Sequence, residues 1–279
     1  EAVQLQKKYT TNHYKPSYVK LFADGVCEGG TGYISFPYKT EALGYGTRIW
    51  EPSTMNAIVN ESNKNGLKVH IHTMGDAAVS EAVDAFINSM QENGYYRNSI
   101  AHVALCSQED FLRIKKYNIS VSSGANWSSQ ITQEDIDSVK DTLYDENVVR
   151  SMYPYQEYVK YGIKAALHTD NPCSPGILDI FGYIQVLVNG YDHSGDIKPE
   201  SFPRRTNFIT IRDAIDMFTI NGAWMNNLEN ERGSIEVGKY ADFIFADRDP
   251  FKVDSNEIWR AYVTNTFFEG NEVYNNSEN

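Results

Sequence analysis

The sequence has 279 residues, which is enough for one or two domains with a sizeable core. Its 37 acidic residues outnumber its 25 basic residues, and the formal net charge of −12 excludes a protein that binds nucleic acid through a basic surface. No apolar run approaches the roughly 18 residues of a membrane span. The three cysteines, Cys27, Cys106 and Cys173, are too few and too far apart for a disulfide framework, which favours a reducing compartment such as the cytoplasm.

Short apolar runs alternate with helical patterns along most of the chain, which is typical of βαβ units and a parallel sheet. The predicted strands are 18–23, 67–72, 99–103, 119–122 and 163–167, and the predicted helices are 53–65, 76–90, 108–116 and one that ends over 157–161. The long polar stretch 123–147 is predicted to be a functional loop. Short alternating strands with a hairpin turn at Gly270-Asn271 predict a β-rich appendage, so we expect domains at 1–228 and 229–279.

Ionisable side chains lie at the ends of these predicted strands, where parallel α/β folds place their active sites. They are Lys20 in the first strand, His70 and His72 in the second, His102 in the third and Asp170 just after the fifth. A single histidine in such a place is more often a packing residue. Three histidines together with a carboxylate indicate a divalent metal site as strongly as they indicate packing residues, because imidazole and carboxylate are the ligands that zinc and its neighbours prefer.

Five short segments indicate the protein family more specifically, through their amino-acid sequences and their order along the chain. They read VKLFADG (19–25), HIHTMGD (70–76), IAHVALC (100–106), LHTDNP (167–172) and GSIEVGKYADFIFADRDPF (233–251). Together they resemble the second half of the amidohydrolase superfamily, in particular its amidohydrolase family 3 branch. The resemblance implies an α/β fold with a partial (β/α)8 TIM-type barrel, whose strands resemble the fourth to the eighth, and a small C-terminal β-sandwich appendage.

The same resemblance implies a metal-dependent hydrolase of C–N bonds in small amide, N-acyl or cyclic amide substrates. Lys20 matches the lysine that bridges two metals as its carbamate, and His72 and His102 match the histidines that bind the more exposed metal. Asp170 matches the aspartate that binds the other metal and carries the proton from the attacking water to the leaving group. The implied cofactor is one or two divalent ions, with zinc expected from the ligand types. We interpret His70 as a neighbour of the ligands or a core residue.

Substrate contacts are predicted in two loops. Gly29 and Gly30 lie in the glycine-rich loop after the first strand, and Ser122, Asn126 and Trp127 follow the fourth strand. Outside these loops, Asp76 directly precedes an apolar helical pattern, so it is predicted to cap the amino end of that helix.

One departure from the family pattern concerns the start of the chain. The superfamily has a His-x-His pair well before the bridging lysine, whereas only 19 residues precede Lys20 and their sole histidine is His13. We therefore expect the first three barrel strands to be absent and an open sheet edge to be covered by a second copy, a partner chain or a missing N-terminal half. The alternative function is a catalytically incompetent subunit with an incomplete metal site and a protein-binding role only.

Overall fold

The computed structural model describes residues 1–128, 137, 139, 141–143, 146–170, 179–192 and 208–276. These residues form two compact units. The first unit is Glu1–Ser122 with two short later pieces around residues 142 and 162, and the second unit holds the other described residues. Cys173 and much of the predicted loop 123–147 lie outside the described residues, and the predicted boundary at 228/229 stays a prediction.

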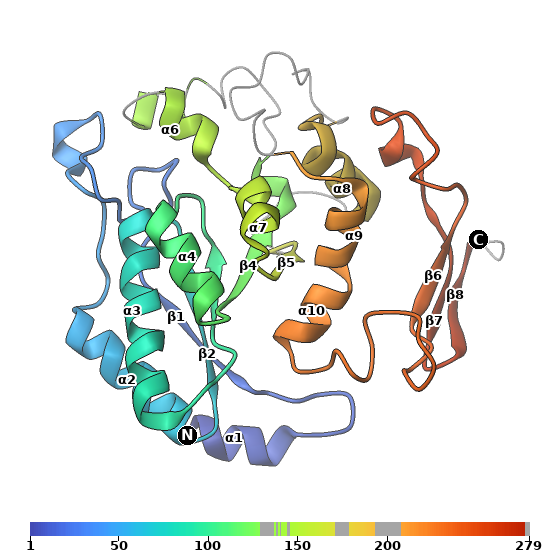
Figure 1. Ribbon diagram of the computed structural model, residues 1–279, viewed down its shortest axis with the longest axis horizontal. Coiled ribbons are helices and arrows are strands. Elements are labelled where there is room, and N and C mark those ends of the chain that lie inside the picture. Colours follow the sequence, from blue (N-terminus) through green and yellow to red (C-terminus); the bar gives the residue numbers. More distant parts are fainter. Residues whose placement is uncertain are drawn as a thin grey trace. The chain divides into compact units, whose positions relative to one another are not determined.

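The helices and strands alternate as the sequence predicts (Figure 1). The strands are β1 (Tyr18–Phe22), β2 (Lys68–Thr73), β3 (Ser99–His102), β4 (Ser120–Gly124), β5 (Ala165–His168), β6 (Phe243–Ala246), β7 (Val263–Phe268) and β8 (Asn271–Asn275). The α-helices are α1 (Ala2–Tyr9), α2 (Pro52–Lys64), α3 (Asp76–Asn93), α4 (Gln108–Lys116), α6 (Glu146–Ser151), α7 (Tyr155–Tyr161), α8 (Ile180–Asn189), α9 (Ile211–Phe218) and α10 (Ile220–Met225). Short 3-10 turns are η1 (Glu41–Leu43), η2 (Ala125–Ser128) and η4 (Ile258–Arg260).

The five predicted strands form one sheet in the order β1-β2-β3-β4-β5, and the first four pair in parallel. The register places Lys20 beside His70 and Phe22 beside His72, and it places Thr73 beside His102. The order of the strands follows their order in the chain, as it does in successive βαβ units. The described strands therefore form an α/β sheet with β1 and β5 at its two edges.

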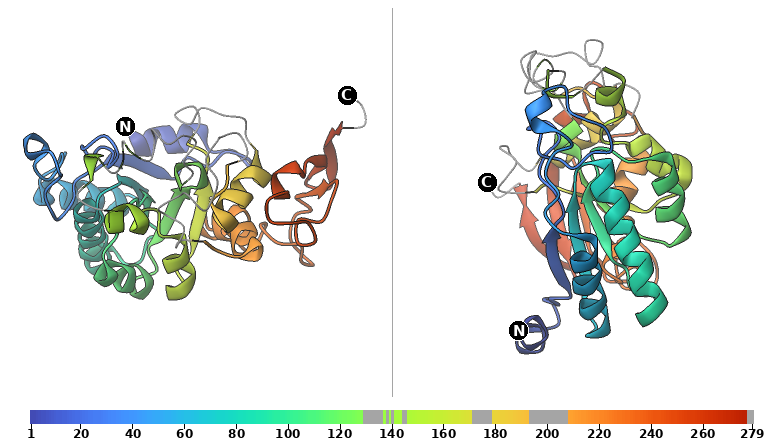
Figure 2. Two further views of the ribbon diagram at one scale, coloured as in Figure 1. Left: turned by 90° about the horizontal axis from the view of Figure 1, so that it is seen from above. Right: turned by 90° about the vertical axis from the view of Figure 1, so that its left-hand side faces the viewer.

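Helices cover one side of this sheet within the first unit. Val69 and Ile71 of β2 are completely buried on that side, and α2 and α3 pack against the strand there. The helices begin and end at expected residues, because α2 starts with Pro52 and Gly66 follows its end with a φ of +78°. Figure 2 shows α2, α3 and α4 layered on the same side of β1 and β2. The alternate residues of β1 and β2 therefore face the other side of the sheet.

The C-terminal part of the second unit contains the antiparallel sheet β6-β7-β8, which confirms the predicted small β-rich appendage. Phe243 and Phe267 stack with ring centroids 4.7 Å apart and hold β6 against β7. The predicted hairpin turn is displaced by one residue, because its central residues are Glu269 and Gly270, with φ values of +50° and +80°, while Asn271 already belongs to β8. Both central residues of this turn need a positive φ.

Across the described part of the chain, the structure holds no helix that is both long enough and apolar enough to cross a membrane.

Candidate metal centre

His72 and His102 come together at the carboxyl ends of β2 and β3. Their ring centroids lie 4.5 Å apart and the ring planes meet at 60°. Both residues are nearly buried, with exposed fractions of 7% and 5%. The ring of Phe22, which is next to His72 in the register, lies 4.9 Å away on the β1 side and is itself 52% exposed. Two of the predicted ligands are thus adjacent beside an accessible aromatic ring.

A backbone carbonyl fixes the orientation of the His72 ring. Nε2 of His72 lies 2.8 Å from the carbonyl oxygen of Gly25, and the tautomer that satisfies this contact has its proton on Nε2 and its lone pair on Nδ1. Metal-binding histidines usually donate their second ring N–H to a carbonyl or carboxylate in this way, which sets the tautomer and the direction of the ligating nitrogen. The His72 ring therefore fits the role of a metal ligand.

The backbone at the end of β3 is strained where it carries the second histidine. His102 and Val103 have φ values of +69° and +52°, a region that β-branched and bulky residues rarely adopt. Each such residue costs on the order of 1–3 kcal/mol and is retained where the surroundings impose it. Here the N–H of Val103 donates to the carbonyl of Thr73 at 2.8 Å, so the end of β3 is held against the end of β2.

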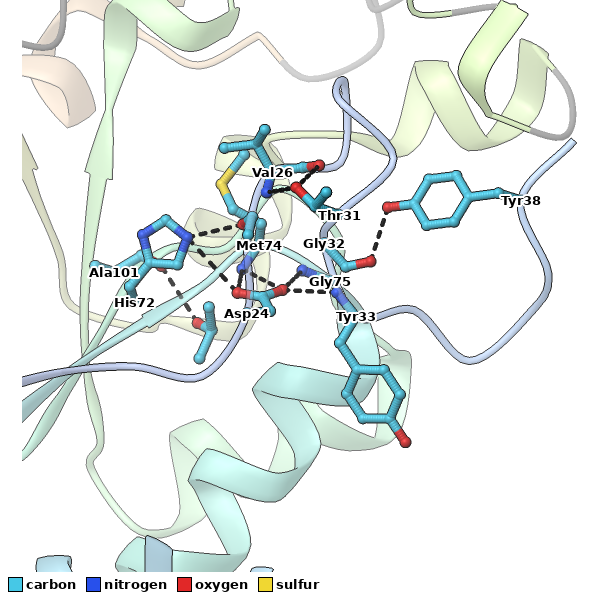
Figure 3. A network of polar contacts seen from close by, with 12 residues as sticks. Asp24, Val26, Thr31, Gly32, Tyr33, Tyr38, His72, Met74, Gly75 and Ala101 are labelled. Carbon is cyan, nitrogen blue, oxygen red and sulfur yellow. Dashed lines mark hydrogen bonds and ion pairs between the residues drawn. The ribbon is translucent and has the colours of Figure 1, made fainter. Parts of the chain in front are cut away.

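A buried carboxylate, Asp24, lies at the centre of this end of the sheet (Figure 3). It follows β1 by two residues and is 2% exposed. The N–H groups of Tyr33, Met74 and Gly75 donate to it over 2.8–3.1 Å, and its Oδ1 lies 3.6 Å from Nε2 of His72. Burial raises the pKa of Asp24 from about 3.8 to about 7, even though the three backbone N–H groups oppose the shift. Asp24 is a functional residue that the sequence patterns did not predict, although it lies in the same segment as Lys20.

The loop after β1 passes very close to the turn whose N–H groups bind Asp24. A Cβ atom on Gly75 would overlap the carbonyl oxygen of Tyr33, so only glycine allows this approach. The carboxylate of Asp76 tightens the same crossing, because it accepts hydrogen bonds from the N–H and the hydroxyl of Ser35. The prediction that Asp76 caps α3 is wrong, since the capping position is Gly75 and the Asp76 side chain binds the loop instead.

Lys20 and His70 share the next level of the sheet, one step below Phe22 and His72. The Lys20 side chain is exposed, and its Nζ lies 5.2 Å from the centre of the Phe22 ring. Nδ1 of His70 lies 2.6 Å from the hydroxyl of Ser99, and its ring meets Tyr18 edge to face. The structure therefore places Lys20 on an accessible side of β1 and His70 in a packed polar contact.

Three predicted substrate contacts belong to the first unit. Gly29 is exposed in the loop after β1, whereas Gly30 is buried there with a φ of +70°. Ser122 is buried in β4 and pairs with Ala101, which in turn pairs with His72, so it lies on the same level of the sheet as that histidine.

The other predicted site residues belong to the second unit. Asp170 follows β5 by two residues, has a φ of +52° and is half-buried. Asn126 and Trp127 are half-buried in η2, directly after β4. Asp24, His72 and His102 all belong to the first unit.

The donor set decides what kind of metal site these residues fit. In the described ranges, no group of three or more His, Cys, Asp or Glu side chains is arranged to hold a metal ion. His72 and His102 supply two adjacent imidazoles, and a third ligand from this unit must come from another kind of side chain. The amine of Lys20 becomes an anionic oxygen donor only after it adds CO2.

Neither cysteine of the first unit is suited to nucleophilic catalysis. Burial raises the pKa of the Cys27 and Cys106 thiols well above the ordinary value. Thiolates are the nucleophilic form, so neither side chain is suited to attack a substrate. Both thiols are free, as the sequence predicts.

The chain is similar to known proteins over nearly its full length. A model described as the amidohydrolase family matches residues 1–274. The putative amidohydrolase YtcJ of Bacillus subtilis is 24% identical over 262 residues, which are 93% of this chain and 47% of that protein. The N-substituted formamide deformylase of Arthrobacter pascens is 22% identical over 233 residues, which are 81% of this chain and 40% of that protein.

The fold has a similar counterpart among solved structures. The crystal structure of an uncharacterized metal-dependent hydrolase from Pyrococcus horikoshii superimposes with a TM-score of 0.74 at 23% identity, over 91% of this chain and 50% of that chain. The chain thus spans about half the length of the relatives and structures that it matches.

Proposed function

The chain belongs to the amidohydrolase family, and on that premise we propose that it is part of a metal-dependent hydrolase that cleaves a C–N bond other than a peptide bond. The observation that carries the proposal is the His72–His102 pair, with the second ring nitrogen of His72 already fixed by the Gly25 carbonyl. The relative named as an N-substituted formamide deformylase supports small molecules with an amide or N-acyl C–N bond as the substrate class.

We propose that His72 and His102 hold the ion, with Lys20 as a third ligand after carboxylation. In that modification, Nζ of Lys20 forms a bond to the carbon of CO2 and loses two protons, one on becoming the neutral amine and one on forming the carbamate, which turns an ammonium into an anionic oxygen donor. A divalent ion such as zinc, when bound, would lower the pKa of a water molecule towards 7 and polarise the scissile carbonyl. Whether one ion or two are held depends on ligands beyond this set.

Asp170 is the proposed proton carrier. As a carboxylate, it would take the proton from the attacking water and pass it to the leaving nitrogen, so that an amine departs as a neutral group. Gly29, Gly30 and Ser122 are proposed to contact the substrate around His72, and Asn126 and Trp127 to contribute from η2. His70 is proposed to support the ligands through its contact with Ser99.

A second candidate function has a specific observation in its favour. The chain spans about half the length of its relatives, and the described residues supply only two clustered imidazoles. In this alternative, the chain is a catalytically incompetent subunit with an incomplete metal site, and its role is only to bind another chain. The free thiols support a reducing compartment, for which we propose the cytoplasm.

The test combines metal analysis with hydrolysis assays on the full chain. Wild-type protein is expected to carry one or two divalent ions and to release amine from N-formyl or N-acyl amines. His72→Ala and His102→Ala should each lower kcat/KM by at least about 100-fold. Loss of a residue that only hydrogen-bonds to a metal ligand already lowers activity about 10- to 100-fold, and loss of the ligand itself should lower it at least as much. His13→Ala is the matched control and should leave both readouts unchanged. Metal-free and inactive wild-type protein would favour the second candidate.

A further inference from the structure

Asp24 joins three segments that meet at the candidate metal centre. Its Oδ2 accepts N–H groups from Tyr33 at 2.9 Å and Gly75 at 2.8 Å, and its Oδ1 accepts the N–H of Met74 at 2.9 Å. Tyr33 belongs to the loop after β1, whereas Met74 and Gly75 form the turn after β2. Both oxygens of the carboxylate are therefore engaged by backbone donors from two segments that are far apart in the sequence.

The same carboxylate borders the imidazole of His72. Oδ1 lies 3.6 Å from Nε2, and the carbonyl oxygen that accepts from Nε2 belongs to Gly25, the residue directly after Asp24. The N–H of Gly25 donates to the carbonyl of Thr31 at 3.1 Å, which holds the peptide in place from the loop side. The Gly25 carbonyl that orients the His72 ring thus lies between the anchored Asp24 and the bond to Thr31.

From this geometry we propose that Asp24 is a positioning residue, which locks the His72 imidazole in its Nε2–H tautomer and ties the loop that carries Gly29 and Gly30 to that histidine. The inference rests on the proposed function of His72 as a metal ligand. Asp24 acts through His72 and has no contact with substrate in this role. Its buried carboxylate would couple the geometry of the His72 ligand to the attachment of this loop.

Asp76 offers a matched comparison within the same structure. Its carboxylate also binds the loop after β1, through the N–H and hydroxyl of Ser35. It starts α3, four residues after His72. Removing one oxygen acceptor from either residue weakens the attachment of the same loop, and the change at Asp24 also alters the carboxylate that borders the His72 imidazole.

The experiment compares Asp24→Asn with Asp76→Asn on the full chain. The amide of Asp24→Asn has the shape of the carboxylate but replaces one acceptor by an NH2 donor, which then faces backbone N–H groups and the Nε2–H of His72. The first readout is the zinc dissociation constant, which is expected to rise about 10- to 100-fold in Asp24→Asn and to stay at the wild-type value in Asp76→Asn. The second readout is the His72 tautomer of metal-free protein, measured by the nitrogen chemical shifts of the imidazole.

The two readouts separate the possible outcomes. A His72 that is an Nε2–H tautomer in wild type and Asp76→Asn but a mixture in Asp24→Asn supports the proposal, even if the protein binds no zinc and the proposed function fails. Equal tautomers and equal zinc affinities in the two variants overturn it while leaving the proposed function intact. If Asp24→Asn does not fold, the wild-type spectrum still decides, because an Nδ1–H tautomer of His72 would overturn the proposal.

Discussion

The two ends of β2 carry buried polar networks of opposite character. At the carboxyl end, Asp24 and His72 are ionisable, and burial holds the pKa of the carboxyl near 7. At the amino end, a neutral network formed by Asn63, Asn98 and Ser89 is buried under α2 and α3. Asn63 and Asn98 exchange hydrogen bonds of 3.0 and 2.9 Å, and Ser89 donates to Asn63 at 2.8 Å.

The difference shows that the amino end of β2 stabilises the fold, whereas its carboxyl end carries the ionisable groups of the candidate site. The amide network also receives the N–H of Val69 and donates to the carbonyl of Leu67, so it closes the start of β2 with matched donors and acceptors. A fully matched neutral network stabilises the fold, whereas a buried ionisable group is kept at a cost. Parallel α/β folds generally place chemistry at the carboxyl ends of their strands and structural residues at the other end.

The largest expected effect is a pH-dependent stability that belongs to the carboxyl end. The pKa of Asp24 is about 7 in the folded protein and about 3.8 when the carboxyl is exposed. Between these values the folded state keeps a proton that the unfolded state has lost, so the free energy of unfolding falls as the pH rises, by about 4 kcal/mol in all. Urea denaturation of chelator-treated wild type should show this slope from about pH 4 to about pH 7. Asp24→Asn does not titrate and should lack it; parallel curves for the two proteins would refute the raised pKa.

The next effect tests the amino end. Asn98→Ala removes the acceptor of the Val69 N–H and two bonds of Asn63, which leaves buried polar groups without partners. The expected loss is about 3 kcal/mol in the free energy of unfolding, because unsatisfied buried groups cost more than a hydrogen bond gains. Zinc affinity should not change in the variant that remains folded. A variant with full stability but weakened zinc binding would reverse the assignment of the two ends.

The smallest effect concerns the edge of the same network. Ser89→Ala removes one donor to Asn63, whose oxygen still accepts from Asn98, so we expect a loss of about 1 kcal/mol in the free energy of unfolding. Lys39→Ala, which breaks an exposed ion pair with Asp141, is the control and should cost less than about 0.5 kcal/mol. Thermal melts of both variants measure the difference, and equal shifts would show that Ser89 adds nothing to the network.

Local patterns were enough to predict the sheet. The apolar alternation predicts β2 at 67–72 and the structure has Lys68–Thr73, while α4 begins and ends at the predicted residues, 108 and 116. The apolar periodicity within such a short segment decides which of its side chains are buried, so a few consecutive residues are enough to predict the element. The placement of His72 and His102 at adjacent strand ends follows from the same pattern.

The supporting residues could not be predicted in that way. Asp24 finds its partners 9, 50 and 51 residues away, and Asp76 binds a serine 41 residues upstream. The local rule for an aspartate before a helix gave Asp76 the wrong role, because a distant loop competes for its carboxylate. The sequence offered one signal for Asp24, namely a charged residue directly after an apolar strand in a segment that also carries the lysine.

The span of these contacts has a consequence for how the protein is made. The bonds from Asp24 to Met74 and Gly75 close a loop of about fifty residues, which forms late because distant contacts must first overcome the entropy of bringing the chain together. The Gly25 carbonyl reaches His72 only when β1 has paired with β2. A chain in which these strands have not paired therefore lacks the finished histidine pocket, so an ion held there as proposed would load after folding.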